Sequence, residues 1–200
     1  MRRSVSGLLF GLAAGLLLAG PASAVTLSEN GAVAHLQGTF ENGDDEAFEQ
    51  FLLRPRAQRL RVLYLYSYGG KIAPAARIAE MVRRAGMTTA VDATRAVCDS
   101  ACTLVFAAGV RRHYVGGDQV FEGTSSRTGL GYHPARRQVN MVEGSHLSEG
   151  GSNVLKAVYA RMGSHAAAEM LSRASINTVY RPSGATALKL KLATSLAAPL

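Results

Sequence analysis

The chain has 200 residues, of which 48% are hydrophobic, and a formal net charge of +8 at pH 7. This length is enough for one domain with a buried core and too short for two domains of ordinary size. The basic residues are scattered rather than gathered in one tract with interleaved aromatic residues, as a nucleic-acid-binding surface would require. We therefore expect no nucleic-acid partner and interpret the charge as solvated surface with some affinity for anionic envelope surfaces.

The first 24 residues have the pattern of a secretory signal peptide. Met1-Arg2-Arg3 is a basic start, residues 8–20 are an apolar run, and Ala22-Ser23-Ala24 is a small-residue cleavage site. The run is short for a membrane span, so attachment to a membrane through an uncleaved signal is the weaker interpretation. The sequence predicts cleavage after Ala24 and export of a mature domain over residues 25–200.

The apolar pattern of the mature chain predicts alternating strands and helices. In chain order these are a hairpin of 25–27 and 32–36 around Asn30-Gly31, a helix from Gly43-Asp44-Asp45 to Arg54-Pro55, a strand over 60–66, a helix over 72–85, a strand over 87–91, a helix beginning at Ser100, strands at 119–121 and 130–133, and helices over 153–162, 165–172 and 185–196. The polar stretches 122–129 and 134–151 are predicted loops. This alternation indicates an α/β domain with a parallel or mixed sheet and helical crossovers.

The stretch from Val97 to Gly109 joins a polar turn to a helix of small residues. Ser100 lies just ahead of this helix or on its first turn, where free N–H groups favour developing negative charge. Catalytic serines are often placed in this way. The alternative is that Ser100 is an N-cap, a position that serine favours.

Cys98 and Cys102 flank Ser100 and are the only cysteines of the chain. Two cysteines in an exported chain indicate a disulfide, and a separation of four residues brings the two Cα atoms within its range in one helical turn. The alternative is a pair of small buried side chains. Two cysteines without clustered histidines do not supply four metal ligands, so we expect no metal and no other cofactor.

Three motifs stand in a fixed order: Ser67-Tyr68-Gly69-Gly70 after a strand, Cys98-Asp99-Ser100-Ala101 at the start of a helix, and Gly131-Tyr132-His133-Pro134 after a strand. Together they resemble the proteolytic subunit of the Clp protease and its relatives in the Clp/crotonase superfamily. The chain looks in particular like the exported Clp-like proteins of Gram-negative bacteria. This resemblance covers residues 60–134, and it implies a single α/β domain of repeated β-β-α spiral units, a periplasmic location and a homo-oligomer.

The resemblance also implies roles for individual residues. Ser100 matches the nucleophile and His133 the general base, while the backbone amides of Gly70 and Ala101 match the donors of an oxyanion hole. The residue types suit this chemistry, because a serine needs a neighbouring base and the oxyanion of acyl transfer needs two fixed N–H donors. The alternative for Gly69 and Gly70 is an ordinary turn between a strand and a helix.

Other histidines compete with His133 for the role of base. They are His113, His146 and His165. His133 is favoured because an apolar segment leads to it and Pro134 follows it. The insertion between the serine helix and His133 is, however, longer than in the Clp subunit.

The third member of the site is open. The Clp pattern has an acidic residue after the histidine, yet no Asp follows Asp118. Asn177 lies nearest to that place, and an asparagine can orient a histidine without supplying charge. The remaining carboxylates are Glu143, Glu149 and Glu169. The site is then a Ser–His dyad, a Ser–His–Asn or Ser–His–Glu triad, or an inactive remnant, and Asp92 and Asp99 are expected to cap helices or pair with arginines.

These observations favour an exported serine hydrolase that cleaves peptides or unfolded proteins. The chain lacks a nucleotide-binding loop of the Gly-x-x-x-x-Gly-Lys type, so the predicted activity is independent of ATP. A second interpretation is a catalytically inactive binding or assembly module of the cell envelope. A crotonase-like enzyme acting on an acyl thioester is the weakest interpretation, because acyl-CoA is not expected outside the cytoplasm.

Overall fold

The structure is a computed structural model, and it describes residues 25–140 and 144–199. The predicted signal peptide, residues 1–24, lies outside the described residues. In chain order the elements are β1 (Val25–Asn30), β2 (Val33–Gly38), α1 (Asp44–Leu52), η1 (Pro55–Arg59), β3 (Val62–Tyr66), α2 (Ile72–Arg84), β4 (Thr88–Asp92), β5 (Val97–Asp99), α3 (Cys102–Ala108), β6 (Arg112–Val115), η2 (Gly117–Gln119), β7 (Gly129–Gly131), β8 (Arg136–Asn140), β9 (Gly144–Leu147), α4 (Glu149–Arg161), α5 (His165–Met170), η3 (Leu171–Arg173) and α6 (Gly184–Lys189), where η marks a 3-10 helix.

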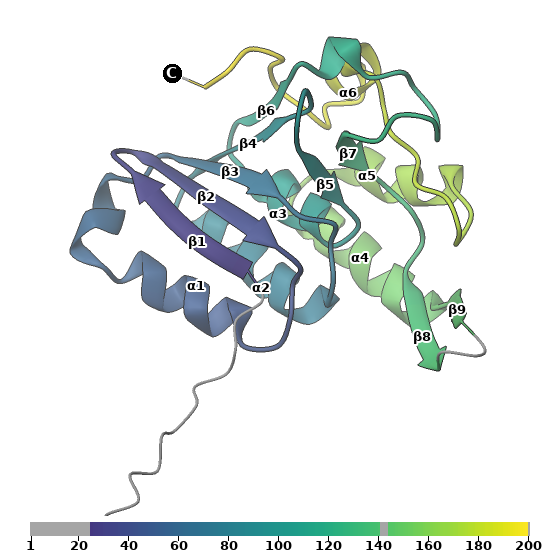
Figure 1. The fold of residues 1–200 in the computed structure, drawn as a ribbon, viewed down its shortest axis with the longest axis horizontal. Helices are drawn as coiled ribbons and strands as arrows, with labels where there is room; N and C mark the ends of the chain where they lie inside the picture. Colours follow the sequence, from purple (N-terminus) through teal and green to yellow (C-terminus); the bar gives the residue numbers. More distant parts are fainter. Residues whose placement is uncertain (1–24, 141–143, 200) are drawn as a thin grey trace, which may run out of the picture.

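Five strands form the main sheet, in the order β1-β2-β3-β4-β6 (Figure 1). β1 and β2 are the antiparallel hairpin predicted around Asn30-Gly31, and Gly31 has a positive φ of 61° at its turn. The other neighbouring strands are parallel, and their connections contain α1, α2 and α3 in turn. The prediction of a mixed α/β sheet with helical crossovers is therefore confirmed.

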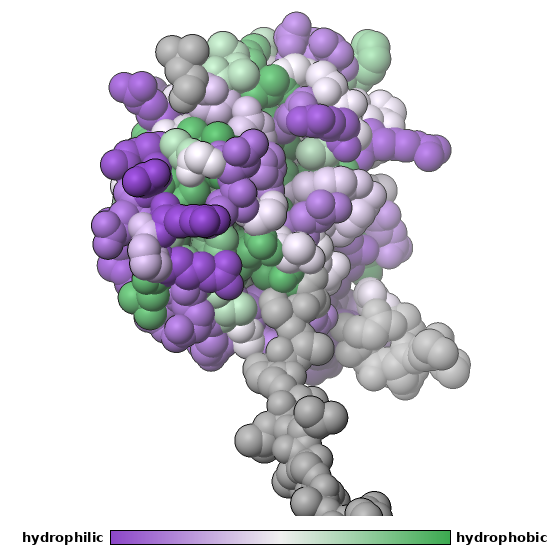
Figure 2. Space-filling model, turned by 60° about the vertical axis from the view of Figure 1, so that its left-hand side comes forward, coloured by the Kyte–Doolittle hydropathy of each residue, from purple (hydrophilic) through white to green (hydrophobic). Residues whose placement is uncertain are grey.

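The strand sequences explain why the helices pack on one face of this sheet. Every second side chain along β2 and β3 is buried beneath the helices, namely Ala34, Leu36, Leu63 and Leu65. The side chains between them point to the opposite face, as the two-residue period of a strand requires. Figure 2, in which the left-hand side of Figure 1 comes forward, shows a face of the molecule with mostly hydrophilic side chains and smaller apolar patches between them.

A second, smaller sheet positions the three sequence motifs. β5 and β7 pair in parallel with Asp99 opposite Gly131, and a bridge joins Ser67, just after β3, to Cys98. The carboxyl ends of β3, β5 and β7 therefore lie together. The sequence pattern predicts neither β5, which it places in a polar turn, nor β6, because both strands are too short to show a period.

Two predictions for the middle of the chain are wrong. At residues 119–121 the structure has the end of η2 and an irregular segment in place of a strand, because Gly116 turns the chain with a φ of 68° and Phe121 is 79% exposed. The stretch 134–151, predicted as a loop, contains the β8–β9 hairpin and the first residues of α4.

The last predicted helix is shorter than expected. α6 ends at Lys189 rather than at residue 196. Lys191 has a positive φ of 55°, and the following segment lies along β6 with Ser195 opposite His113. Pairing with the edge strand thus replaces the predicted final turns.

The helix that follows Ser100 is buried along its whole length. All seven residues of α3, from Cys102 to Ala108, are buried, and the helix contacts α2, α4 and the strands β3, β4 and β5. A close-packed interior tolerates little movement of such an element. The core therefore fixes the start of α3, and with it the serine turn.

Substitution of Leu104 tests this placement of α3. Leu104 is 0% exposed, and Leu104→Ala would leave a cavity that costs about 3 kcal/mol of the free energy of unfolding. The control is Leu53→Ala, at a side chain 71% exposed, which is expected to change that free energy by about 0.5 kcal/mol or less. Urea denaturation measures both, and equal losses in the two variants would contradict a buried α3.

Candidate active site

Ser100 lies between β5 and α3 in a turn with an unusual backbone. Its φ is +54°, and only Ser100 and Lys191 are non-glycine residues with a positive φ in the part of the chain that the structure describes. Such a conformation costs about 1–3 kcal/mol and persists only where the surroundings fix it. Ser100 is not an N-cap, because Ala101 has that position and no side chain caps α3.

A disulfide joins Cys98 and Cys102 across this turn, with their Cα atoms 5.2 Å apart. The predicted pairing is confirmed, but its setting differs from the single helical turn that was expected. Cys98 lies on β5 and Cys102 opens α3, and both are fully buried. The bond therefore closes the chain on both sides of Ser100 and restricts the backbone of the serine.

The Gly69-Gly70 turn packs directly against the serine turn. The N–H of Asp99 donates to the carbonyl of Ser67 at 2.9 Å. A Cβ on Gly69 would lie 2.8 Å from both the Cβ of Ser100 and the carbonyl oxygen of Asp99. Gly69 also has a φ of 97°. Glycine is required here because any side chain would separate the two turns.

The two amides predicted as oxyanion donors lie in these adjoining turns. Within residues 25–140 and 144–199, neither the N–H of Gly70 nor that of Ala101 donates a hydrogen bond. The neighbouring N–H of Lys71, in contrast, donates to the carbonyl of Phe40 at 2.8 Å. An N–H group without a protein acceptor is available to a bound ligand.

His133 reaches the same place from β7. β5 and β7 are parallel and in register, so the residues that follow them emerge at one edge, and the N–H of Ser100 donates to the carbonyl of Gly131 at 2.8 Å. A pocket of about 200 Å³ is lined by Tyr68, Gly70, Ile72, Ser100, His133, Ala135 and Arg136. The structure thus brings Ser100, His133 and Gly70 to one pocket, although no hydrogen bond joins Ser100 to His133 among the described residues.

The contacts of His133 identify its tautomer. Nδ1 lies 2.7 Å from the carbonyl oxygen of Pro134, and Nε2 lies 3.1 Å from Nη2 of Arg136. A carbonyl only accepts and a guanidinium only donates, so Nδ1 carries the proton and Nε2 presents its lone pair. Burial lowers the pKa of His133 below its ordinary value; the Pro134 carbonyl opposes this shift and Arg136 adds to it.

The structure does not bring Asn177 to His133. Asn177 lies in an exposed turn, where its N–H donates to Oγ of Ser175 at 3.2 Å. The Nδ1 of His133 is already bonded to the carbonyl of Pro134. A main-chain carbonyl therefore orients the imidazole, and a backbone acceptor leaves no signal in the sequence.

The candidate glutamates are no closer to this role. Glu149 and Glu169 are exposed, and neither bonds to His133 in the described structure. Glu143 lies outside the described residues. The geometry of the described residues is that of a Ser–His pair without a side-chain acid.

Asp99, which precedes the serine, forms a buried ion pair with Arg181. The two Nη atoms of Arg181 lie 2.6 and 2.9 Å from the two carboxylate oxygens, and the side chains of Arg181 and Asp99 are 5% and 8% exposed. Arg181 also donates to the carbonyls of Ser126 and Gly129. A Cβ on Gly131 would lie 2.1 Å from the Asp99 carboxylate, so this position also requires glycine. The predicted pairing of Asp99 with an arginine is confirmed, whereas no sequence signal singles out Arg181.

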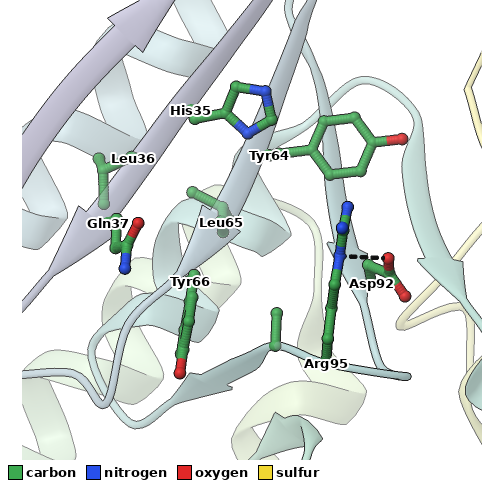
Figure 3. A pocket seen from close by; sticks show the side chains of 9 residues that line it. His35, Leu36, Gln37, Tyr64, Leu65, Tyr66, Asp92 and Arg95 are labelled. Atoms are coloured by element: carbon green, nitrogen blue, oxygen red, sulfur yellow. Dashed lines mark ion pairs between the residues drawn. The ribbon is translucent and has the colours of Figure 1, made fainter.

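A larger pocket of about 420 Å³ lies on the open face of the main sheet (Figure 3). The ring of His35 stacks on that of Tyr64 with centroids 5.4 Å apart. Arg95 extends alongside and pairs with Asp92 at 2.8 Å. Neither Ser100 nor His133 lines this pocket, so the candidate active site is the smaller pocket.

Two further features concern ligands and membranes. Among the described residues, no group of three or more His, Cys, Asp or Glu side chains is placed to hold a metal ion. None of the helices in that part of the chain has the length and apolar character that crossing a membrane would need.

Comparison with solved structures defines the fold. A serine-to-alanine mutant of the 1510-N membrane-bound stomatin-specific protease is 12% identical with a TM-score of 0.62, over 84% of this chain and 79% of that chain. A lysine-to-alanine mutant of the same protease in complex with a substrate peptide is 12% identical with a TM-score of 0.59, over 84% of this chain and 75% of that chain. An enoyl-CoA hydratase from Shewanella pealeana is 15% identical with a TM-score of 0.48, over 86% of this chain and 67% of that chain. No protein-family profile matches the chain, and no curated protein sequence is significantly similar to it.

The chain therefore has the Clp/crotonase type of α/β fold that its three motifs predict. The TM-score of 0.62 to the serine-to-alanine mutant of the stomatin-specific protease shows this. At 12% identity this similarity concerns the fold alone.

Removal of the Asp99 carboxylate tests the dependence of the site on its buried ion pair. Asp99→Ala would leave Arg181 buried without a counterion, and we predict a loss of about 3–5 kcal/mol in the free energy of unfolding. The control is Asp92→Ala, which breaks a pair whose arginine side chain is 77% exposed and should cost about 1 kcal/mol or less. Chemical denaturation compares the two, and losses of similar size would show that the Asp99 pair is not structural.

Proposed function

We propose that the mature chain is an exported serine hydrolase that cleaves peptide bonds in peptides or unfolded proteins without ATP. One observation carries the proposal: Ser100 is held at a positive φ in a disulfide-closed turn, at a pocket that it shares with a buried, neutral histidine. Nucleophilic serines of several hydrolases stand on strained turns of this kind, which expose the hydroxyl. Ser100 is the proposed nucleophile and His133 the proposed base.

The proposed reaction is an acyl transfer in two stages. Oγ of Ser100 attacks the carbonyl carbon of the scissile amide while its proton passes to Nε2 of His133. The carbonyl oxygen becomes an oxyanion that accepts from the N–H groups of Gly70 and Ala101. The C–N bond then breaks as His133 gives the proton to the leaving amine. A water molecule next gives a proton to Nε2 and attacks the carbonyl carbon of the acyl-enzyme. The ester bond to Oγ then breaks as His133 returns that proton to Oγ, which releases the acid and restores Ser100.

The surroundings of His133 suit a base. Burial lowers the pKa of His133, which favours the neutral imidazole that a base requires. The bond from Nδ1 to the Pro134 carbonyl leaves the lone pair on Nε2, and it replaces the side-chain acid of a triad as the orienting group. We therefore propose a Ser–His dyad rather than a triad with Asn177.

The proposed location is the periplasm, with cleavage of the signal after Ala24. The signal pattern of residues 1–24 supports export, and a disulfide is typical of an oxidising compartment. An uncleaved signal is the only membrane attachment included in this proposal. Assembly into a homo-oligomer is proposed from the resemblance to the Clp proteins.

A second candidate function is a catalytically inactive module that binds or assembles. The observation in its favour is the contact between Nε2 of His133 and Arg136 at 3.1 Å. That nitrogen would have to accept the proton of Ser100, and in this state its lone pair is already occupied. The two candidates differ in whether any bond is cleaved.

Peptide cleavage distinguishes them. The oxidised chain 25–200 is incubated with an unfolded protein and a mixed peptide library, and mass spectrometry records the products. We predict cleavage that Ser100→Ala and His133→Ala each reduce by about a thousandfold or more, since nucleophile and base act as a unit. Ser172→Ala and His165→Ala, at exposed positions outside the pocket, should leave the rate unchanged. A folded chain that cleaves nothing, or cleavage that persists in Ser100→Ala, would contradict the hydrolase function.

A further inference from the structure

Arg136 lines the Ser100 pocket, and no acidic residue of the described chain pairs with it. It is an exposed residue on β8, and its one side-chain hydrogen bond in the described structure goes from Nη2 to Nε2 of His133. The ion pairs among the described residues all involve other cations. Among the described residues, the only side-chain acceptor of this guanidinium is therefore a neutral imidazole.

The described residues that line the pocket include no anion. Besides Arg136, its lining consists of uncharged residues and the neutral His133. The carboxylate that acts on His133 is that of Asp99, and Arg181 already binds both of its oxygens. Among the described lining residues, Arg136 is thus the single charge that a molecule entering the pocket would meet.

Two acceptors would compete for Arg136 when an anion enters. A carboxylate accepts two parallel, charge-assisted hydrogen bonds from a guanidinium, and these are stronger than one bond to a neutral ring nitrogen. A carboxylate that accepts from both Nη groups of Arg136 displaces Nε2 of His133 from Nη2, and the lone pair of Nε2 becomes free.

We propose that Arg136 selects substrates that carry a carboxylate beside the scissile bond, and that its transfer from His133 to this carboxylate frees Nε2 for the proton of Ser100. This inference rests on the proposed hydrolase function. The carboxylate belongs either to an acidic side chain or to the C-terminus of the peptide. Without a substrate carboxylate, Arg136 stays bonded to Nε2 and the site has low activity. This explains the Arg136–His133 contact, which also favours the inactive module.

Matched peptides test this selection. One peptide is made with Glu or with Gln beside the cleaved bond, and each form with a free or an amidated C-terminus, so that the two sources of carboxylate are separated. The wild-type chain should cleave one acidic form faster than its neutral counterpart by about tenfold or more in kcat/KM. Arg136→Ala should lose this preference and cleave the neutral peptide faster than the wild type does, because Nε2 is then free. Arg136→Lys keeps the charge without the fork and should fall between them.

Arg137 provides the matched control, since it is the exposed neighbour of Arg136 on the same strand and outside the pocket lining. Arg137→Ala should retain the wild-type preference. Equal cleavage of acidic and neutral peptides by the wild type, or equal loss on both in Arg136→Ala, would overturn the selection while leaving the hydrolase function standing. Absence of cleavage in every variant, Arg136→Ala included, would overturn the hydrolase function and the selection with it.

The contact itself has a readout that does not depend on activity. NMR titration of His133 follows its pKa in the folded chain, where Arg136 and Asp99 are the charged groups that act on it. Arg136→Ala removes the cation that disfavours the imidazolium, so the pKa should rise, whereas Arg137→Ala should not change it. An unchanged pKa in Arg136→Ala would overturn the proposal that Arg136 holds Nε2.

Discussion

The buried ion pair between Asp99 and Arg181 is the interaction on which the arrangement of the site depends. Asp99 is the last residue of β5 and directly precedes the serine, and Arg181 comes from the C-terminal part of the chain. Through its further bonds to the carbonyls of Ser126 and Gly129, Arg181 also holds the segment that leads into β7. Removing two charges from water costs free energy, and only a fully hydrogen-bonded ion pair offsets this cost. The pair therefore holds β5 and β7 in one fixed arrangement. The positions of Ser100 and His133 follow from that register.

The serine turn stores strain that several independent contacts support. The positive φ of Ser100 is sustained by the disulfide around it, by the buried helix α3 behind it and by the glycine turn pressed against it. Each contact prevents the turn from changing to a less strained conformation. Backbone strain that is maintained in this way is typical of functional sites. The constraint also explains the requirement for glycine at positions 69 and 131, where a Cβ would meet Ser100 or Asp99.

The parts of the structure that local chemistry decides are predictable from the sequence. The Asn30-Gly31 hairpin, the helix α2 that ends before Gly86 and the Cys98–Cys102 bond depend on residues close together in the chain, and each was predicted. The grouping of Ser100, His133 and Gly70 was reached through the order of three motifs rather than through any local pattern. The short strands β5 and β6 were missed because their partners, not their own sequences, define them.

The remaining parts of the site depend on contacts that the sequence does not encode locally. Arg181 is separated from Asp99 by 82 positions, and nothing distinguishes it from the other arginines before the fold is known. Asn177 was proposed as the third member from its order in the chain, whereas the acceptor at Nδ1 of His133 is the backbone carbonyl of Pro134. Arg136 was one basic residue among many until its contact with Nε2 placed it in the pocket.

Covalent labelling shows whether Ser100 is an activated nucleophile. The oxidised chain 25–200 and its Arg136→Ala variant are treated with a fluorophosphonate, and the adduct is located by peptide mass spectrometry, with His133→Ala as the control. We predict an adduct on Ser100, formed faster in Arg136→Ala and lost in His133→Ala. A folded chain that forms no adduct in either background, or an adduct on a different serine, would contradict an activated nucleophile at Ser100.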